Sequence, residues 1–216
     1  LAARMNFPSQ HPLNQTEHAR ALIAGADVIL GLETPNIWGA IHSYSDQLYR
    51  SSKPIAKQDA KIITITATDL YMKSNYQDFQ RYAEVDLAMA ADAEATLPSL
   101  IDAVKSQITG DRKRTFEDRG KKLAVQHDDA LRRSRDEAAY GWDASPISTS
   151  RLCAEIYAAI KNEDWSLVSE VSPWVNRWPL RLWKFDKFHQ YMGSSGGFGV
   201  GYGAPASLGA ALANKK

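Results

Sequence analysis

Cysteine is the scarcest residue type in this chain, whose 216 residues contain a single one, Cys153. One thiol excludes an internal disulfide framework, a four-thiolate zinc site and a Cys-x-x-Cys redox pair. Low cysteine use is typical of a reducing compartment, and we therefore expect a cytoplasmic protein.

The chain also lacks an excess of either charge and any long apolar run. Lysine and arginine number 26 against 25 aspartates and glutamates, which gives a formal net charge of +1. This balance provides no electrostatic basis for binding nucleic acid. No apolar stretch approaches the ~18 to 20 residues that cross a bilayer, and the first residues lack the layout of a secretory signal, so we expect no membrane partner.

Glycine, by contrast, is concentrated near the end of the sequence. Five glycines fall within the eight positions 196–203, and the small-residue pattern of a helix follows over residues 206–213. Missing Cβ atoms let a flat ligand approach the main chain, and Pro205 suits the first turn of the helix. Because main chain in front of a helix N-terminus commonly holds phosphorylated cofactors, this segment is the best candidate for a binding site.

The first half of the chain alternates apolar runs with helical patterns. The runs at 26–33, 61–67 and 85–90 predict strands, and the first of them suits a strand buried on both faces. Helices are expected over 15–24, with Asn14 or Thr16 as cap, and over 93–107. Strands alternating with helices predict an α/β fold with a Rossmann-like parallel sheet.

The second half begins with a charged segment at 109–143, which we interpret as a helical linker lying on a surface. A new unit is expected from Ile147, with a helix over 151–160 capped by Ser150 or Thr149 and a strand over 165–171. Aromatic residues then gather in a stretch that we expect to form a core or a subunit contact: Trp174, Trp178, Trp183, Phe185, Phe188 and Tyr191.

This order of elements, together with Ser-Thr-Ser-Arg-Leu at 148–152 and Gly-Gly-Phe-Gly-Val-Gly-Tyr-Gly-Ala-Pro-Ala at 196–206, resembles the thiamine-diphosphate-dependent enzymes of the acetolactate synthase and 2-oxo-acid decarboxylase group. The resemblance covers nearly the whole chain. It implies that residues 1–140 are the central domain with a helical linker, and that residues 147–216 are the truncated start of a second α/β domain, which binds the cofactor.

The resemblance also implies roles for individual residues around the glycine segment. In the family, this segment contacts the aminopyrimidine ring, and a bulky aliphatic side chain holds the cofactor bent. Val200 takes that wedge position, Phe198 and Gly199 supply nearby backbone, and Gly201 and Tyr202 line the same side. Two further residues replace the Gly-Gln-His stretch that acetolactate synthases place at the diphosphate, namely Ser172 and Trp174.

The implied function is that of a lyase or transferase acting on a small 2-oxo acid, by decarboxylation, carboligation or both. We expect the chain to be a fragment, inactive alone, of a protein that forms a homodimer or homotetramer. The catalytic glutamate is expected before Leu1, and the motif that binds Mg²⁺ together with thiamine diphosphate after Lys216. We accordingly assign no catalytic residue and no metal ligand within the chain.

Other interpretations of the glycine segment remain open. Glycines before an alanine-rich helix also permit close packing of helix on sheet, without any cofactor. A nicotinamide site is less well supported, because the alternating glycines never give G-x-G-x-x-G, and no G-x-x-x-x-G-K-[ST] phosphate loop occurs. The alternative function is therefore a non-catalytic α/β module that binds a nucleotide or mediates assembly.

Overall fold

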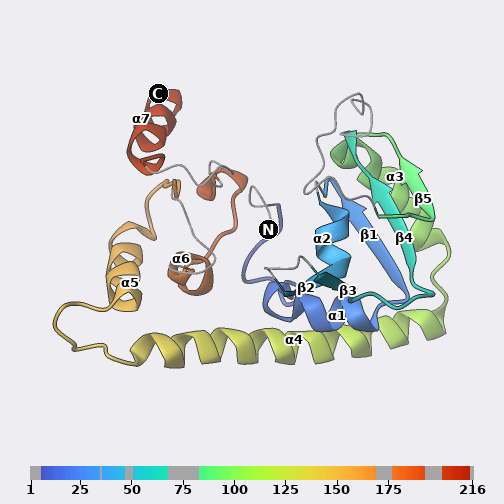
Figure 1. The fold of residues 1–216 in the computed structure, drawn as a ribbon, viewed down its shortest axis with the longest axis horizontal. Coiled ribbons are helices and arrows are strands. Elements are labelled where there is room, and N and C mark those ends of the chain that lie inside the picture. Colours follow the sequence, from blue (N-terminus) through green and yellow to red (C-terminus); the bar gives the residue numbers. More distant parts are fainter. Residues whose placement is uncertain are drawn as a thin grey trace. The chain divides into compact units, whose positions relative to one another are not determined.

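The fold is mixed α/β and divides into two compact units (Figure 1). The computed structural model describes residues 6–34, 36–46, 51–67, 83–168, 177–192 and 201–214. One unit comprises residues 16–115, and the other combines residues 1–15 with 116–216. The division of the chain into domains at 1–140 and 147–216 stays a prediction.

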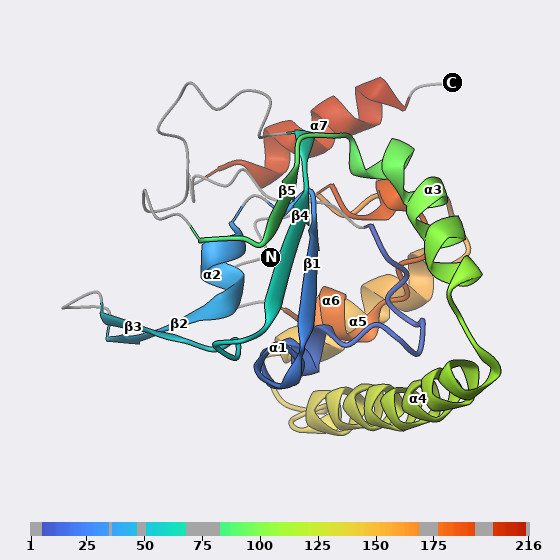
Figure 2. The same ribbon diagram turned by 90° about the vertical axis from the view of Figure 1, so that its right-hand side faces the viewer.

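Three parallel strands form the centre of the unit at 16–115. They are β1 (Val28–Leu32), β4 (Lys61–Ile65) and β5 (Leu87–Met89), in the order β1-β4-β5. Ile29 lies opposite Ile62, and Ile65 lies opposite Met89. All three strands lie within the runs from which strands were predicted, and the parallel sheet is confirmed. Figure 2 shows this sheet nearly edge-on, with α2 (Ile37–Ile41) and α3 (Ala93–Ser106) on opposite sides.

The expectation that the first strand is buried on both faces is wrong. Val28 and Leu30, which alternate onto one face of β1, are 59% and 41% exposed. The other face is tightly packed, because a Cβ added at Gly31 would lie 3.1 Å from the Cδ1 atom of Ile37 in α2. A continuous apolar run therefore does not by itself distinguish one buried face from two.

The remaining elements of this unit precede or flank the sheet. A 3-10 turn, η1 (Thr16–His18), leads into α1 (Ala19–Gly25), and β2 (His42–Asp46) pairs antiparallel with β3 (Ser51–Pro54). The α-helix thus begins later than the predicted residue 15, and neither Asn14 nor Thr16 is its N-cap. The N-cap residue of α1 is His18, whose side chain makes no capping hydrogen bond.

Helices dominate the other unit. They are α4 (Gly110–Ala139), α5 (Thr149–Ile160), α6 (Trp178–Leu182), the 3-10 turn η4 (Phe188–Gln190) and α7 (Gly203–Ala213). The first residues of α4, up to residue 115, belong to the unit at 16–115. The predicted charged helix corresponds to α4. Residues 6–15 join this unit through Ser9, which exchanges hydrogen bonds with the Phe185 backbone, and through Asn14, whose carbonyl oxygen lies 2.7 Å from His127 Nδ1.

An aromatic cluster forms the core of the helical unit, as the sequence predicted for part of the stretch between 174 and 191. Trp165, Trp183 and Phe185 are buried, and the Trp165 and Trp183 ring centroids lie 5.4 Å apart, edge to face. Phe188 is an exception, because it is 79% exposed. Within 165–168, the described part of the predicted strand, pairing is limited to one parallel bridge between Leu167 and Tyr191.

None of the helices in the described ranges combines the length and the apolar character that crossing a membrane requires.

Candidate functional site

The glycine segment enters the described part of the chain at Gly201, two residues before α7. Gly201 has a φ of +96°, in the left-handed region that L side chains rarely adopt. Tyr202 then adopts helical backbone angles and is half-buried, with no capping hydrogen bond from its side chain. At this position, glycine is required by the backbone conformation itself.

No described side chain packs against the glycine Cα atoms where α7 begins. A Cβ atom added at Gly201 or at Gly203 would meet no other atom of the described residues within 4 Å. The same holds for Gly209 in the middle of the helix. Within the described ranges, close packing on the protein's own residues therefore does not explain these three glycines.

Helix α7 itself presents an apolar surface. It has no buried residue, and Leu208 and Leu212, one turn apart, are 69% and 67% exposed. Ser207 turns its hydroxyl back onto the helix, where Oγ donates to the Gly203 carbonyl over 2.7 Å. The polar group of Ser207 is thus used locally, while the leucines stay available for contact.

Five of the seven residues predicted to contact a cofactor lie outside the described residues: Ser172, Trp174, Phe198, Gly199 and Val200. Gly201 and Tyr202 are the two that the structure describes, and they are neighbours in the chain. The arrangement of all seven around a common ligand stays a prediction.

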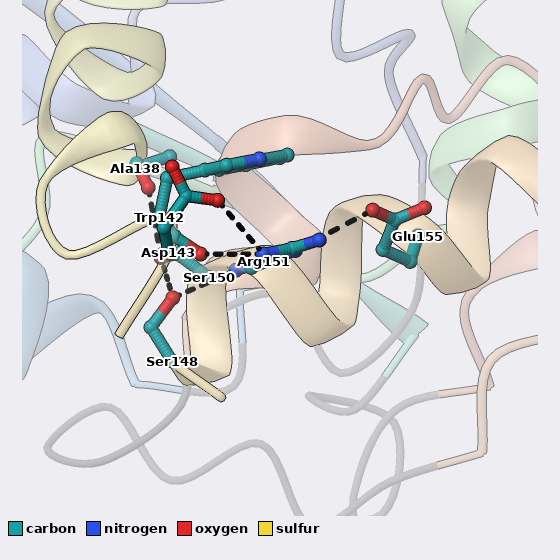
Figure 3. A network of polar contacts seen from close by, with 7 residues as sticks. All are labelled: Ala138, Trp142, Asp143, Ser148, Ser150, Arg151 and Glu155. Atoms are coloured by element: carbon teal, nitrogen blue, oxygen red, sulfur yellow. Dashed lines mark hydrogen bonds and ion pairs between the residues drawn. The ribbon is translucent and has the colours of Figure 1, made fainter. Parts of the chain in front are cut away.

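The junction of α4 and α5 carries a polar network that fixes the start of α5 (Figure 3). Ser148 is the N-cap, since its side-chain oxygen accepts from the Arg151 N–H over 3.2 Å. The predicted caps were Thr149 and Ser150. Ser150 is instead buried, and its hydroxyl donates to the Ala138 carbonyl over 3.0 Å. Each hydroxyl therefore satisfies a different backbone group, and α4 is joined directly to α5.

Arg151 occupies the centre of this network. Its Nη1 donates to the Trp142 carbonyl over 2.9 Å and to Asp143 Oδ1 over 3.2 Å, and its Nε lies 3.6 Å from Glu155 Oε1. The guanidinium also lies over the Trp142 ring, 5.6 Å from its centroid. With two carboxylates and a carbonyl around it, the charge of Arg151 is matched by the protein, which indicates a structural role.

Helix α5 also contacts the aromatic cluster. The Cys153 carbonyl accepts from Trp183 Nε1 over 2.8 Å, and the aromatic cluster around Trp183 includes Tyr191. Burial raises the pKa of the Cys153 thiol, which keeps it protonated and unreactive. The buried state of Cys153 agrees with the sequence-based expectation.

A small polar cluster lies around Asp164. His189 Nε2 lies 2.8 Å from Asp164 Oδ1, and Lys187 approaches the same carboxylate at 3.7 Å. Within these ranges, no group of three or more His, Cys, Asp or Glu side chains is placed to hold a metal ion.

Comparison with known proteins gives no relative for this chain: no family model matches it, and neither do any curated protein or solved structure.

Proposed function

We propose that this chain is part of a thiamine-diphosphate-dependent enzyme that acts on a 2-oxo acid, by decarboxylation, carboligation or both. The observation that carries the proposal is the open, left-handed main chain at Gly201, directly before the eleven-residue helix α7. Bare backbone in front of a helix N-terminus suits a phosphorylated cofactor with a flat ring. The sequence pattern around it adds the likeness to this enzyme family.

The residues proposed to hold the cofactor divide into two groups. Gly199, Val200, Gly201 and Tyr202, with the Phe198 backbone, orient the aminopyrimidine ring, and Val200 keeps the cofactor bent. Ser172 and Trp174 offer a hydroxyl and an indole N–H to the diphosphate. When bound, thiamine diphosphate supplies the electron sink for decarboxylation. The chain's own residues position it, while the Mg²⁺ ligands and the glutamate that protonates the pyrimidine are proposed to come from outside residues 1–216.

The same proposal places the chain in a cytoplasmic homodimer or homotetramer, with a Rossmann-like central domain and the start of a second α/β domain. The exposed pair Leu208 and Leu212 supports an oligomer, because an apolar row on a helix gains stability when a neighbouring subunit covers it. These leucines also favour the second candidate function, a non-catalytic assembly module.

A calorimetric titration separates the two candidates. Thiamine diphosphate with Mg²⁺ is titrated into the protein translated from the complete gene, as wild type, Val200→Asp and Val200→Leu. Wild type should bind saturably. The Asp variant should bind at least roughly tenfold more weakly, because it places an unpaired carboxylate against an apolar ring face. The Leu variant keeps an aliphatic wedge and should bind as wild type does.

A folded wild-type protein that takes up no cofactor, or an Asp variant with unchanged affinity, would contradict the enzyme proposal. Residues 1–216 alone should release no CO₂ from a 2-oxo acid in the presence of both cofactors. Turnover by this chain alone would show that the catalytic groups lie within it, against the assignment made above.

A further inference from the structure

A second feature of the molecule, independent of the proposed function, lies at the carboxyl edge of the sheet in the unit at 16–115. Glu33 directly follows β1, and its φ of +45° lies in the left-handed region. Among the described residues it is the single non-glycine residue with positive φ. Such a conformation costs energy and persists where surrounding contacts maintain it.

Those contacts come from the ends of the two other strands. The Glu33 N–H donates to the Ile65 carbonyl at the end of β4. The Glu33 carboxylate accepts from the Thr66 hydroxyl at 3.1 Å, from the Ala67 N–H at 3.2 Å and from the Ala93 N–H at 3.0 Å. Thr66 and Ala67 follow β4, and Ala93 opens α3 after β5. One side chain therefore joins the carboxyl ends of all three strands.

The three donors have the character of an anion site. Two are backbone N–H groups, one of them at the positive end of a fourteen-residue helix, and the third is a hydroxyl. In parallel α/β sheets, the crevice outside the carboxyl ends of the strands is where ligands bind, phosphates in particular. Here a carboxylate of the protein itself uses the donors that a bound anion needs.

We propose that Glu33 is the built-in occupant of this anion cradle, formed by Thr66, Ala67 and Ala93, and that it closes these three donors to nucleotide phosphates. When the side chain is removed, a free small carboxylate takes its place. The proposal bears on the nucleotide-binding alternative, because a filled cradle leaves these donors no capacity for a nucleotide.

The test follows the Ala67 and Ala93 amide resonances by NMR while acetate is added, with chloride at matched ionic strength as the reference salt. In Glu33→Ala, acetate should shift both resonances along one saturable curve and raise the midpoint of thermal unfolding, as expected for a ligand of the folded state. Glu33→Gly should respond alike and fold more readily, because glycine accepts a φ of +45°.

Three proteins serve as controls. Wild type should give no saturable response to acetate, and ADP should leave its Ala67 and Ala93 amides unshifted. Glu94→Ala removes a carboxylate from the first turn of the same helix without opening the cradle, and should behave like wild type. Glu33→Gln keeps a side chain of the same length in the cradle and should also be silent.

Two kinds of result would overturn the proposal. One is a folded Glu33→Ala or Glu33→Gly protein whose two amides ignore acetate, which would mean that the donors form no anion site. The other is a wild-type protein whose amides respond saturably to acetate or ADP, which would mean that Glu33 does not close the site.

Discussion

Arg151 holds Trp142 in two ways, since its Nη1 donates to the Trp142 carbonyl over 2.9 Å and its guanidinium lies 5.6 Å from the centroid of the Trp142 ring. The first contact fixes the backbone between α4 and α5, and the second covers the indole face. The planar guanidinium makes both contacts at once, donating from its edge while its face lies on the ring, and the ammonium group of lysine has no such face.

Replacing Arg151 with lysine should therefore lower the free energy of unfolding by about 1 kcal/mol, although the positive charge is retained. Urea unfolding monitored by tryptophan fluorescence measures the change. Arg132→Lys is the matched control, because Arg132 is 70% exposed and pairs with Asp129 on the surface of α4. That exchange should stay within about 0.5 kcal/mol of wild type. Equal effects at both positions would show that the junction does not depend on Arg151 geometry.

The start of α5 gives a second prediction. Ser148→Ala should cost about 1 kcal/mol, because it removes the oxygen that accepts from the Arg151 N–H at the first turn. Thr149→Ala removes an exposed hydroxyl that is not the cap and should change stability by less than about 0.5 kcal/mol. Denaturant unfolding of both variants decides which residue caps the helix. A larger loss of unfolding free energy in Thr149→Ala than in Ser148→Ala would mean that Thr149 is the cap.

These neighbouring hydroxyls illustrate what the sequence does and does not reveal. Apolar runs in the sequence predicted β1, β4 and β5. Helical patterns predicted α3 and α5, and the charged stretch with sparse apolar residues predicted α4. Three consecutive hydroxyl residues at 148–150 are chemically equivalent as caps, so the choice among them depends on packing against Ala138. The five-residue α2 is too short to show a helical period, and the antiparallel strands β2 and β3 are short and polar, so neither produces a periodic signal.

The glycine segment at Gly201 and the Glu33 cradle also differ in how far the sequence reveals them. Gly201 is visible in the sequence, because clustered glycines mark backbone that needs positive φ or close approach. Glu33 is not, because its importance arises from Ala67 and Ala93, whose N–H groups are brought to it by strand order rather than by any side-chain motif. Backbone donors leave no residue-type signature, so a cradle built from them becomes apparent only in three dimensions.

Gly201 itself supplies a third prediction. Gly201→Ala should destabilise the start of α7 by about 1–2 kcal/mol, because alanine is strained at a φ of +96°. Gly209→Ala, inside the same helix, should stabilise it by about 0.5–1 kcal/mol, because alanine favours helix and the added Cβ would meet no side chain or neighbouring element of the described residues. Amide hydrogen exchange along α7 measures both changes locally. Faster exchange in both variants would mean that the added methyl, not the backbone angle, is responsible.

The last prediction concerns the ion pair between Lys61 and Asp86, whose Nζ and Oδ1 atoms are 2.7 Å apart. The hydrogen bond from Lys61, followed by that from the Ile62 N–H, lowers the pKa of Asp86 below its ordinary value of 3.8. The same hydrogen bond and the charge of Asp86 raise the pKa of Lys61 above 10.5. In Lys61→Met, the pKa of Asp86 should rise toward 3.8 but remain below it, because the Ile62 N–H still donates.

The sign of each shift fixes the pH range in which the pair stabilises the fold. The lowered pKa of Asp86 contributes stability above pH 3.8, and this is lost as the pH falls through the folded-state pKa. The raised pKa of Lys61 contributes stability below pH 10.5, and this is lost as the pH rises through the folded-state pKa of the lysine. Carbon-13 NMR titration of the Asp86 carboxyl measures the shift directly. Lys57→Met breaks the separate pair with Asp27 and should leave Asp86 unchanged. An Asp86 pKa that is insensitive to Lys61→Met would mean that the backbone N–H alone sets it.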